Sequence, residues 1–223
     1  MPAAGHGSRM AADLPKQYLK LDQRTVAEHS VARLLDSVPL QALVVVVAAD
    51  DPLWPQLPVA SRAGVVTAFG GPTRAESVLN GLAALPGAGD HDWVLVHDMA
   101  RPCVRAADIR RLIEECGSDG AILAAPVADT LKQSDGSRIL ATLDRSTVWR
   151  ALTPQLFPVG ALRAALQTAL QAGAEITDEA SAMERAGWQP RLVAGAADNI
   201  KITWPADLPL ARFFLAQQQQ EHA

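Results

Sequence analysis

Five apolar runs, each of the length of a β-strand, recur along the chain. They cover residues 42–49, 64–69, 93–97, 120–127 and 190–195. Continuous runs rich in β-branched residues are typical of strands buried on both faces of a sheet. We therefore expect each run to form an interior strand.

Segments with the apolar spacing of helices separate these runs. Thr25 and Thr73 each precede a glutamate by three residues, which is the T-x-x-E pattern of a capping box at a helix start. The alternation of strands and helices predicts an α/β fold with a doubly wound, mostly parallel sheet, in which ligands bind at the carboxyl ends of the strands. Apolar residues three and four positions apart follow each threonine, namely Val31, Leu34 and Leu35, and Val78, Leu79 and Leu82.

One region breaks the alternation. Residues 127–143 contain two short strand-like stretches around the turn SDGS, with no helix to cover them. Because an isolated hairpin is only marginally stable in water, we expect this β-arm to pack against another surface. A second subunit is the natural candidate.

Composition narrows the class of protein. The chain has 223 residues, 49% of them hydrophobic, so we expect one domain over residues 1–223 with a frayed helix end at 217–223. The 20 basic and 24 acidic residues give a net charge of −4, which provides no positive surface for a nucleic-acid backbone. Cys103 and Cys116 lack the spacing of a metal or redox site, and we recognise no signal peptide or membrane span. The composition predicts a soluble cytoplasmic protein that binds neither nucleic acid nor membrane.

The segment PAAGHGSRM, which begins at Pro2, places a glycine turn near two cations. It lacks the G-K-[ST] end of a Walker A loop and the third glycine of the dinucleotide fingerprint. One interpretation is a tight turn that needs glycine only for its backbone conformation. The other is an anion site, because Arg9 and Lys16 could join the N–H groups of the turn. A triphosphate fits that combination.

Two further loops follow predicted strands. Gly70 and Gly71 stand between a strand and a capped helix, where they could let the backbone approach a flat base, with Ser77 as a polar contact; a plain strand-to-helix turn with a packing serine is the alternative. Asp98 ends another strand with Arg101 close behind it. Its carboxylate could hold Mg²⁺ or a substrate hydroxyl, or could simply anchor the loop by pairing with Arg101.

The remaining candidates lie in the second half of the chain. Thr177 could instead be the N-cap of the next helix. Lys201 stands between Ile200 and Ile202, so it must point either into a site or to solvent, and the pattern alone favours solvent. The full set is Thr130, Arg145, Thr153, Thr177 and Lys201.

Eight motifs, taken in order, resemble those of the 2-C-methyl-D-erythritol 4-phosphate cytidylyltransferase family. They are PAAGHGSRM, PKQYL, GGPTRAESV, VLVHDMARPC, AAPVADTLK, ALTPQLFP, ITDEASAME and DNIKIT, and they cover essentially the whole chain. The resemblance implies a Rossmann-like nucleotidyltransferase fold and a homodimer. It also implies an enzyme of non-mevalonate isoprenoid biosynthesis that joins CTP to methylerythritol phosphate and releases pyrophosphate, with Mg²⁺ or another divalent cation.

The resemblance assigns roles to matching positions. It implies that Arg9, Lys16, Arg145 and Lys201 are catalytic, the first two by stabilising the transition state and the others by positioning the phosphate of the second substrate. It implies a metal contact at Asp98. The implied nucleotide contacts are Pro2, Ala3, Ala4, Gly5, Gly7, Arg9, Lys16, Gly71, Ser77 and Asp98. The implied contacts to the second substrate are Asp98, Arg101, Thr130, Arg145, Thr153, Thr177 and Lys201.

Three departures from the family pattern affect these expectations. Pro72 has no N–H, so it cannot donate a backbone hydrogen bond to the base. Met99 stands where relatives usually carry alanine, and we expect it to crowd the sugar of the nucleotide. Relatives also begin with an apolar strand that leads into the PAAG loop, whereas here Met1 directly precedes Pro2, so the first strand of the sheet is expected to be missing. Two other functions stay open: a ribitol phosphate cytidylyltransferase, and an inactive dimeric nucleotide-binding protein that has lost its first strand.

Overall fold

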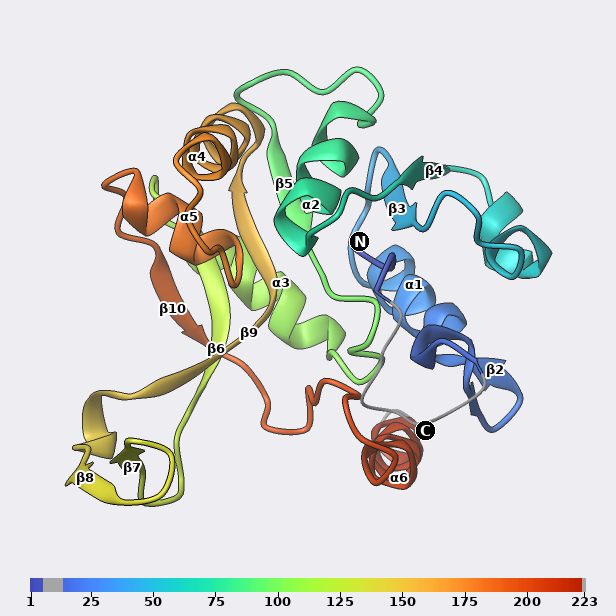
Figure 1. Ribbon diagram of the computed structural model, residues 1–223. Helices are drawn as coiled ribbons and strands as arrows, with labels where there is room; N and C mark the ends of the chain where they lie inside the picture. The colour runs from blue at the N-terminus through green and yellow to red at the C-terminus, as the bar shows by residue number, and fades with distance from the viewer. Residues whose placement is uncertain (6–13, 222–223) are drawn as a thin grey trace.

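The computed structural model describes residues 1–5 and 14–221 (Figure 1). Its strands are β1 (Lys20–Leu21), β2 (Arg24–Thr25), β3 (Leu43–Val47), β4 (Val65–Phe69), β5 (Trp93–Val96), β6 (Ala121–Pro126), β7 (Lys132–Ser134), β8 (Ile139–Thr142), β9 (Trp149–Pro158) and β10 (Arg191–Ala194). Its α-helices are α1 (Val26–Ser37), α2 (Arg74–Ala83), α3 (Ala106–Glu115), α4 (Val159–Gln171), α5 (Glu179–Arg185) and α6 (Asp207–Gln220). Short 3-10 turns occur at η2 (Lys16–Tyr18), η3 (Trp54–Gln56), η4 (Pro58–Ser61) and η5 (Arg145–Thr147).

All five predicted strands are present, as β3, β4, β5, β6 and β10. β3 is buried along its whole length, as a strand covered on both faces must be. It pairs in parallel with β4, and β10 pairs in parallel with β6. The α/β class and the strand positions are therefore confirmed. The expectation of burial on both faces is wrong for β4, β5 and β10, which end their ladders and are partly exposed.

The sheet is mixed rather than mostly parallel, because of one strand that the apolar pattern does not reveal. β9 lies between β5 and β6 and runs antiparallel to both. Its polar stretch Thr153–Gln155 includes Pro154, and proline argues against an interior strand. The register between β6 and β9 shifts between Ile122 and Ala124, so Pro154 lies in a part of β9 that is not paired with β6.

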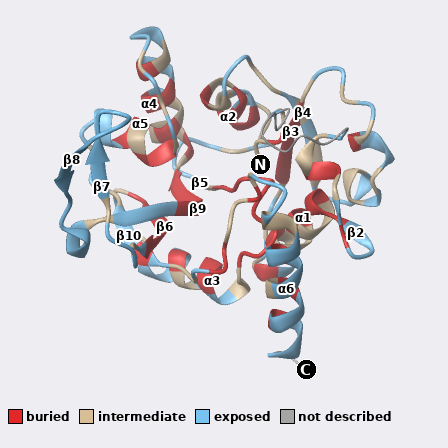
Figure 2. Cartoon of the chain, turned by 60° about the horizontal axis from the view of Figure 1, so that its bottom comes forward, coloured by how far each residue is buried: buried red, intermediate tan, exposed pale blue. Residues whose placement is uncertain are grey.

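Helices cover both faces of the sheet, as a doubly wound fold requires. Residues of α1 and α3 share one core cluster with β3 and β6, and residues of α2, α4 and α5 form another cluster with Val96 and Ile122. Both predicted capping boxes are confirmed, with Thr25 and Thr73 as the N-caps of α1 and α2. Figure 2 shows the buried residues concentrated on the inner strands and on the helix faces that meet them.

Residues Met1–Ala3 form a short bridge beside β3. Pro2 pairs in parallel with Val46, the Ala3 N–H donates to the Val46 carbonyl at 2.7 Å, and the Met99 N–H donates to the Pro2 carbonyl at 3.5 Å. Otherwise the β3–β4 pair and the four-stranded sheet β10-β6-β9-β5 remain separate ladders in the described part of the chain.

The predicted β-arm is a hairpin of β7 and β8, paired antiparallel. Its side chains are exposed, including Ile139 at 67% and Leu140 at 60%. Figure 1 shows it projecting away from the sheet. No helix among the described residues has the length and apolar character needed to cross a membrane.

The predicted frayed end at 217–223 is wrong for residues 217–220, which complete α6. The Gln218 side chain is buried and donates to the Cys103 carbonyl at 2.9 Å. A polar glutamine run predicts solvent exposure, but here one glutamine satisfies a buried carbonyl across the helix interface.

Candidate active site

A cavity of about 360 Å³ brings together five of the motifs singled out in the sequence. Its walls come from the loop after Pro2, the η2 turn, the turn before α2, and the segments that follow β5 and β10. The predicted site residues that line it are Pro2, Ala3, Ala4, Gly5, Lys16, Gly71, Ser77, Asp98 and Lys201. Gly7 and Arg9 lie outside the described residues. These motifs, which lie far apart in the sequence, therefore share one cavity.

The loop from Pro2 to Gly5 is held on two sides. Its start continues the ladder of β3, and the Gln17 amide donates to the Ala3 carbonyl at 2.9 Å. On the other side Gly70 packs so closely that an added Cβ would lie 2.6 Å from the Cβ of Ala4. Glycine is therefore needed at position 70 to let the two loops meet.

Ser77 stabilises the turn in front of α2. Its hydroxyl accepts from the Gly71 N–H at 3.1 Å and donates to the Thr73 carbonyl at 2.9 Å. A Cβ on Gly71 would lie 2.6 Å from the Cβ of Glu76, so this turn also requires glycine. The turn interpretation is thus correct for these residues, and the same residues face the cavity. Pro72 also lines it.

Asp98 is the electrostatic centre of the cavity. Lys201 Nζ lies 2.7 Å from Asp98 Oδ2, and Arg74 Nη2 lies 2.9 Å from Asp98 Oδ1. Burial alone would raise the pKa of Asp98, but the charges of Arg74 and Lys201 outweigh burial and hold that pKa well below its usual range. The expectation that Lys201 points to solvent is wrong, because the buried carboxylate attracts its ammonium group into the site.

Sequence reasoning missed Arg74, which lines the cavity, and Glu179, the buried carboxylate that binds it. Arg74 Nη1 and Nη2 donate to the two Glu179 oxygens at 2.6 and 3.0 Å, while the same guanidinium contacts Asp98. The Glu179 side chain is 1% exposed. Burial raises its pKa, and the charge of Arg74 opposes that shift. Both residues stand inside quoted motifs, but nothing local in the sequence reveals a pair 105 residues apart.

A buried chain of hydrogen bonds supports Asp98 from behind. The Asp98 N–H donates to Thr153 Oγ1 at 3.0 Å, Thr153 Oγ1 contacts His97 Nδ1 at 2.9 Å, and His97 Nε2 contacts the Arg101 carbonyl at 3.0 Å. Burial lowers the pKa of His97 to about 4, so the ring is neutral near pH 7. A neutral ring that accepts from Thr153 at Nδ1 donates from Nε2. Thr153 is thus a buried support of the strand end.

Two neighbours of Asp98 have different surroundings. Arg101 is buried, its Nη1 donates to the Asn199 carbonyl at 2.8 Å, and its Nε lies 3.9 Å from Asp98. The loop-anchor interpretation therefore applies to this pair, although Asp98 also faces the cavity. Met99 is 2% exposed and packs in the core cluster of α1 and α3 while also lining the cavity.

Five of the predicted residues do not line this cavity: the buried Arg101 and Thr153, which support Asp98, and three others. Thr130, Arg145 and Thr177 are exposed. Arg145 lies at the base of the arm and donates to the Ala128 carbonyl. The interpretation of Thr177 as an N-cap is wrong by one residue, because Asp178 caps α5 and accepts from the Ser181 N–H at 2.9 Å.

The charged side chains that line the cavity favour an anion. Lys16, Arg74 and Lys201 face it together with one carboxylate, Asp98. Lys16 Nζ donates to the Ile202 carbonyl at 2.9 Å, which places its ammonium between the η2 turn and the segment after β10. An excess of fixed positive charge in a concave site attracts phosphate groups.

Asp98 does not fit a resident metal centre in this arrangement. Both of its oxygens are paired with cationic side chains, and the described residues contain no cluster of three or more metal-ligating His, Cys, Asp or Glu residues. Stable metal sites on proteins use several oxygen ligands. The Asp98 carboxylate is thus engaged by Arg74 and Lys201 and does not suit a metal ion.

The chain is similar to known proteins over nearly its whole length. Residues 1–217 match the family described as IspD, 2-C-methyl-D-erythritol 4-phosphate cytidylyltransferase. The enzyme of that name from Pseudomonas aeruginosa is 56% identical over 213 residues, or 93% of this chain and 91% of the relative. The one from Actinobacillus pleuropneumoniae is 49% identical over 221 residues, or 99% and 96%.

Solved structures of similar sequence have the same fold as this chain. The crystal structure of Francisella tularensis 2-C-methyl-D-erythritol 4-phosphate cytidylyltransferase is 35% identical and covers 96% of each chain, with a TM-score of 0.83. A crystal structure titled 4-diphosphocytidyl-2C-methyl-D-erythritol synthase is 41% identical, with a TM-score of 0.82 over 96% of this chain and 95% of that one. With its motifs gathered around one cationic cavity and these matches along its length, the chain belongs to the 2-C-methyl-D-erythritol 4-phosphate cytidylyltransferase family.

Proposed function

We propose that this chain transfers a cytidylyl group from CTP to 2-C-methyl-D-erythritol 4-phosphate. The products are 4-diphosphocytidyl-2-C-methyl-D-erythritol and pyrophosphate. The observation that carries the proposal is the cavity in which the loop from Pro2 to Gly5 faces Lys16, Lys201 and the turn at Gly71. Membership of the family and near-complete coverage of its relatives support the same reaction.

The charges of the cavity suit this reaction. A phosphate oxygen of methylerythritol phosphate attacks the α-phosphorus of CTP and the bond to pyrophosphate breaks, so negative charge gathers on the α-phosphate and on the leaving group. Both reactants are anions that must be brought together. The work of the protein is therefore positioning and charge neutralisation, with no covalent intermediate required.

Lys16 and Lys201 reach the cavity from different segments. Lys16 stands at the start of η2, next to the loop from Pro2 to Gly5, where it can neutralise the phosphates of the nucleotide. Lys201 is held by Asp98 at 2.7 Å, so its ammonium is already oriented before the second substrate enters. A lysine acts on phosphate as a compact point charge, which can follow charge that moves between groups.

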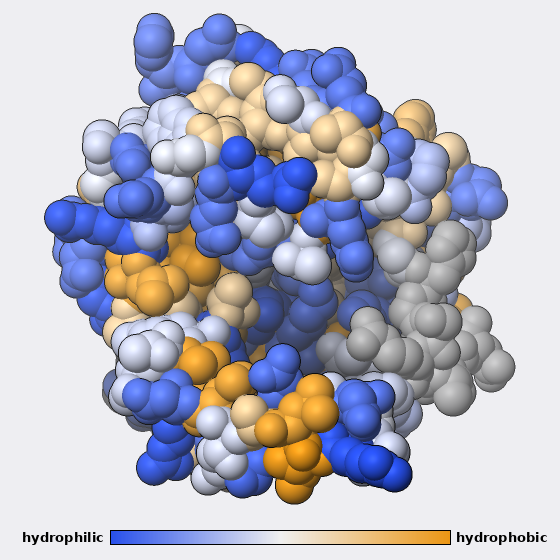
Figure 3. Space-filling model, turned by 60° about the vertical axis from the view of Figure 1, so that its left-hand side comes forward, coloured by the Kyte–Doolittle hydropathy of each residue, from blue (hydrophilic) through white to orange (hydrophobic). Residues whose placement is uncertain are grey.

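A homodimer would complete the second half of the site. Thr130, Arg145 and Thr177 are exposed and lie outside the cavity, and the arm carries the exposed apolar side chains Ile139 and Leu140. Figure 3 turns the side that bears the arm toward the viewer and shows apolar side chains at the surface of this face. We infer that the arm packs on a second copy and brings Arg145 to the partner's cavity.

The divalent cation stays a prediction of the resemblance, and the cytoplasmic location stays a prediction of the composition. A requirement for Mg²⁺ is tested by titrating MgCl₂ and then a chelator into the assay described next. A cytoplasmic location is tested by fractionating cells that produce the protein at its natural level.

The experiment that tests the function measures pyrophosphate release with CTP and each of two acceptors. Release with methylerythritol phosphate and none with ribitol phosphate is the expected result. The reverse preference would identify a ribitol phosphate cytidylyltransferase. Binding of CTP in a titration, without pyrophosphate release with either acceptor, would identify an inactive nucleotide-binding protein and refute the proposed reaction.

A further inference from the structure

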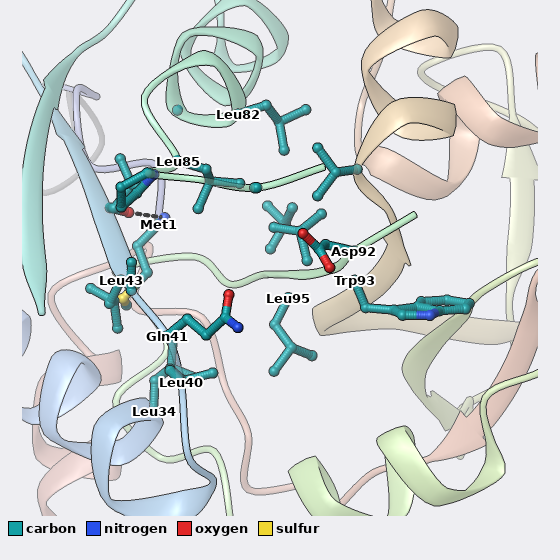
Figure 4. Close-up of a pocket in the computed structure, with 18 of the residues that line it drawn as sticks. Met1, Leu34, Leu40, Gln41, Leu43, Leu82, Leu85, Asp92, Trp93 and Leu95 are labelled. Carbon is teal, nitrogen blue, oxygen red and sulfur yellow. Dashed lines mark hydrogen bonds between the residues drawn. The ribbon is translucent and has the colours of Figure 1, made fainter. Parts of the chain in front are cut away.

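Glu179 is a fully buried carboxylate that the proposed reaction does not use directly. It lines neither the active-site cavity nor a second, apolar cavity of about 310 Å³ between β3 and β5. Figure 4 shows leucines around that second cavity, with Asp92 as its labelled carboxylate. Since Glu179 faces neither cavity, any effect on the reaction must pass through its hydrogen-bond partner, Arg74.

The guanidinium of Arg74 directs four hydrogen bonds to two carboxylates. Two of them reach Glu179, from Nη1 at 2.6 Å and from Nη2 at 3.0 Å. The other two reach Asp98 Oδ1, from Nε at 3.2 Å and from Nη2 at 2.9 Å. A guanidinium has five N–H donors, so most of them are already used inside the protein. Arg74 is therefore better suited to hold Asp98 than to bind a phosphate.

The two oxygens of Asp98 are divided between two cations. Both Arg74 donors reach Oδ1, whereas Lys201 Nζ lies 2.7 Å from Oδ2. An arginine commonly pairs with a carboxylate through two parallel hydrogen bonds, one to each oxygen. Glu179 opposes that arrangement, because it holds the Nη1–Nη2 edge of Arg74 and so fixes the direction from which the Nε edge meets Asp98. The oxygen Oδ2 stays available to Lys201.

The start of helix α5 holds Glu179 in place. Glu179 is the first residue of α5 and directly follows its N-cap, Asp178. Gln155 of β9 accepts from the Ala180 N–H at 2.9 Å and donates to Asp178 Oδ2 at 2.8 Å, so this helix start is tied to the sheet. Arg74 is likewise the first residue of its helix, α2. Two anchored helix starts thus fix the angle between the guanidinium and the carboxylate.

We propose that Glu179 and Arg74 form a positioning pair, which assigns one oxygen of Asp98 to Arg74 and leaves the other to Lys201. Loss of Arg74 would leave the Asp98 carboxylate free to rotate, and loss of Glu179 would allow Arg74 to take both of its oxygens. In either case Lys201 loses its fixed place before the second substrate binds. The inference rests on the proposed function, in which Lys201 acts on methylerythritol phosphate. The effect should therefore fall on that substrate and spare CTP.

The main test is the double variant Arg74→Met/Glu179→Leu. It removes one cation and one anion, so the net charge beside the cavity is unchanged, and apolar side chains of similar volume often replace a buried ion pair without loss of stability. We expect kcat/KM for methylerythritol phosphate to fall by about tenfold or more, because a misplaced cation acts poorly on its substrate. The Kd for CTP should stay within about twofold.

A matched control removes an ion pair elsewhere on the surface. Arg62 and Asp36 are exposed and lie 3.2 Å apart. The double variant Arg62→Gln/Asp36→Asn should leave both kcat/KM and the Kd for CTP unchanged, since exposed ion pairs contribute little. Urea unfolding of all the variants shows which of them are folded under the assay conditions.

A second measurement follows Lys201 without the reaction. Acetic anhydride labels lysine side chains, and mass spectrometry of the peptides gives the rate at Lys201 relative to the exposed Lys20. An ammonium held by a carboxylate must leave its partner before it reacts, so we expect labelling of Lys201 to rise by about threefold or more in the double variant. Glu179→Gln, which keeps the volume of the side chain, should raise it in the same direction.

Three results would overturn the proposal. An unchanged kcat/KM in a folded double variant would leave the pair a purely structural role. A loss of CTP affinity as large as the loss of kcat/KM would mean that Arg74 acts on the nucleotide. Unchanged labelling of Lys201 would show that the pair does not hold this lysine.

Two further outcomes are separated by the same measurements. If the double variant does not fold, kcat/KM and labelling in Glu179→Gln decide the matter, and unchanged values there refute the pair. If the unmodified chain releases no pyrophosphate, the proposed function fails, and the labelling of Lys201 still tests whether Glu179 and Arg74 position it.

Discussion

The guanidinium of Arg74 and the carboxylate of Glu179 meet through two hydrogen bonds, of 2.6 and 3.0 Å. The same guanidinium reaches Asp98 at 2.9 Å. Glu179 is buried and does not line the active-site cavity, whereas Arg74 and Asp98 do. Glu179 therefore acts through Arg74, which it orients toward the carboxylate that holds Lys201.

Replacement of Glu179 by alanine should destabilise the protein by about 2 kcal/mol or more. Removing one partner of a buried ion pair usually costs about 3–5 kcal/mol. The loss should be smaller here because Arg74 keeps Asp98 and its side chain is 25% exposed. Urea unfolding measures the change, with exposed Glu184→Ala on the same helix as the matched control. Equal losses for the two variants would contradict a structural role for the Arg74–Glu179 pair.

Lys16→Ala should lower turnover far more than it lowers affinity for CTP. The contact of a cation with the phosphates strengthens as charge develops in the transition state, so we expect a loss in kcat of about 10²-fold or more. Steady-state kinetics and CTP titration separate the two effects. Lys20→Ala, which removes an exposed lysine nearby, should behave as the unmodified chain. A loss of affinity with unchanged kcat would reassign Lys16 to simple binding.

Pro72→Ala should tighten the binding of CTP. Pro72 lines the cavity next to Gly71 but has no N–H to donate. A buried acceptor left without a partner costs about 1–3 kcal/mol, so a restored N–H should lower Kd by about fivefold or more. Calorimetric titration of both chains with CTP measures the difference, and Pro72→Asp asks whether an added carboxylate helps further. An unchanged or raised Kd for Pro72→Ala would show that no acceptor of the ligand lies at this position.

The free energy of unfolding should decrease as the pH is lowered through the range in which His97 takes up a proton. Its folded pKa of about 4 lies below the ordinary value of 6.5, so the unfolded chain takes up a proton first as pH falls. The contribution of His97 is complete above pH 6.5 and is lost as pH falls toward 4, by about 3 kcal/mol in total.

Urea unfolding at pH values from about 7.5 to about 4 measures this change in the free energy of unfolding. His97→Gln should flatten the fall, because a neutral amide can serve the same two partners without titrating. His91→Gln removes an exposed histidine and should leave the curve unchanged. Parallel curves for all three chains would show that His97 does not link folding to protonation.

Mixed dimers test whether Arg145 acts on the partner's cavity. If each site combines Lys16 of one chain with Arg145 of the other, a dimer of Lys16→Ala and Arg145→Ala chains has one site with both changes and one intact site. Random mixing makes about half of the dimers mixed, so about a quarter of full activity should return. Each variant alone should stay at its own low rate. If verified subunit exchange restores nothing, Arg145 acts within its own chain.

Local sequence patterns were sufficient to predict the positions of five strands and the starts of two helices. The five apolar runs all became strands, although only β3 and β6 are buried along most of their length. The capping boxes at Thr25 and Thr73 begin helices through hydrogen bonds that span only three residues. The order of the motifs also predicted which loops would share a cavity, because the carboxyl ends of parallel strands lie at one edge of a sheet.

The amino-acid sequence alone determined where the apolar strands and capped helices form, since these depend on neighbours within a few positions. Only the tertiary structure decided that β9 inserts antiparallel between β5 and β6, that Lys201 turns inward, and that Arg74 binds Glu179. In each case a polar or proline-containing segment is stabilised by a partner far away in the chain. The free energy of a buried charge depends on that partner, and the partner is present only once the chain has folded.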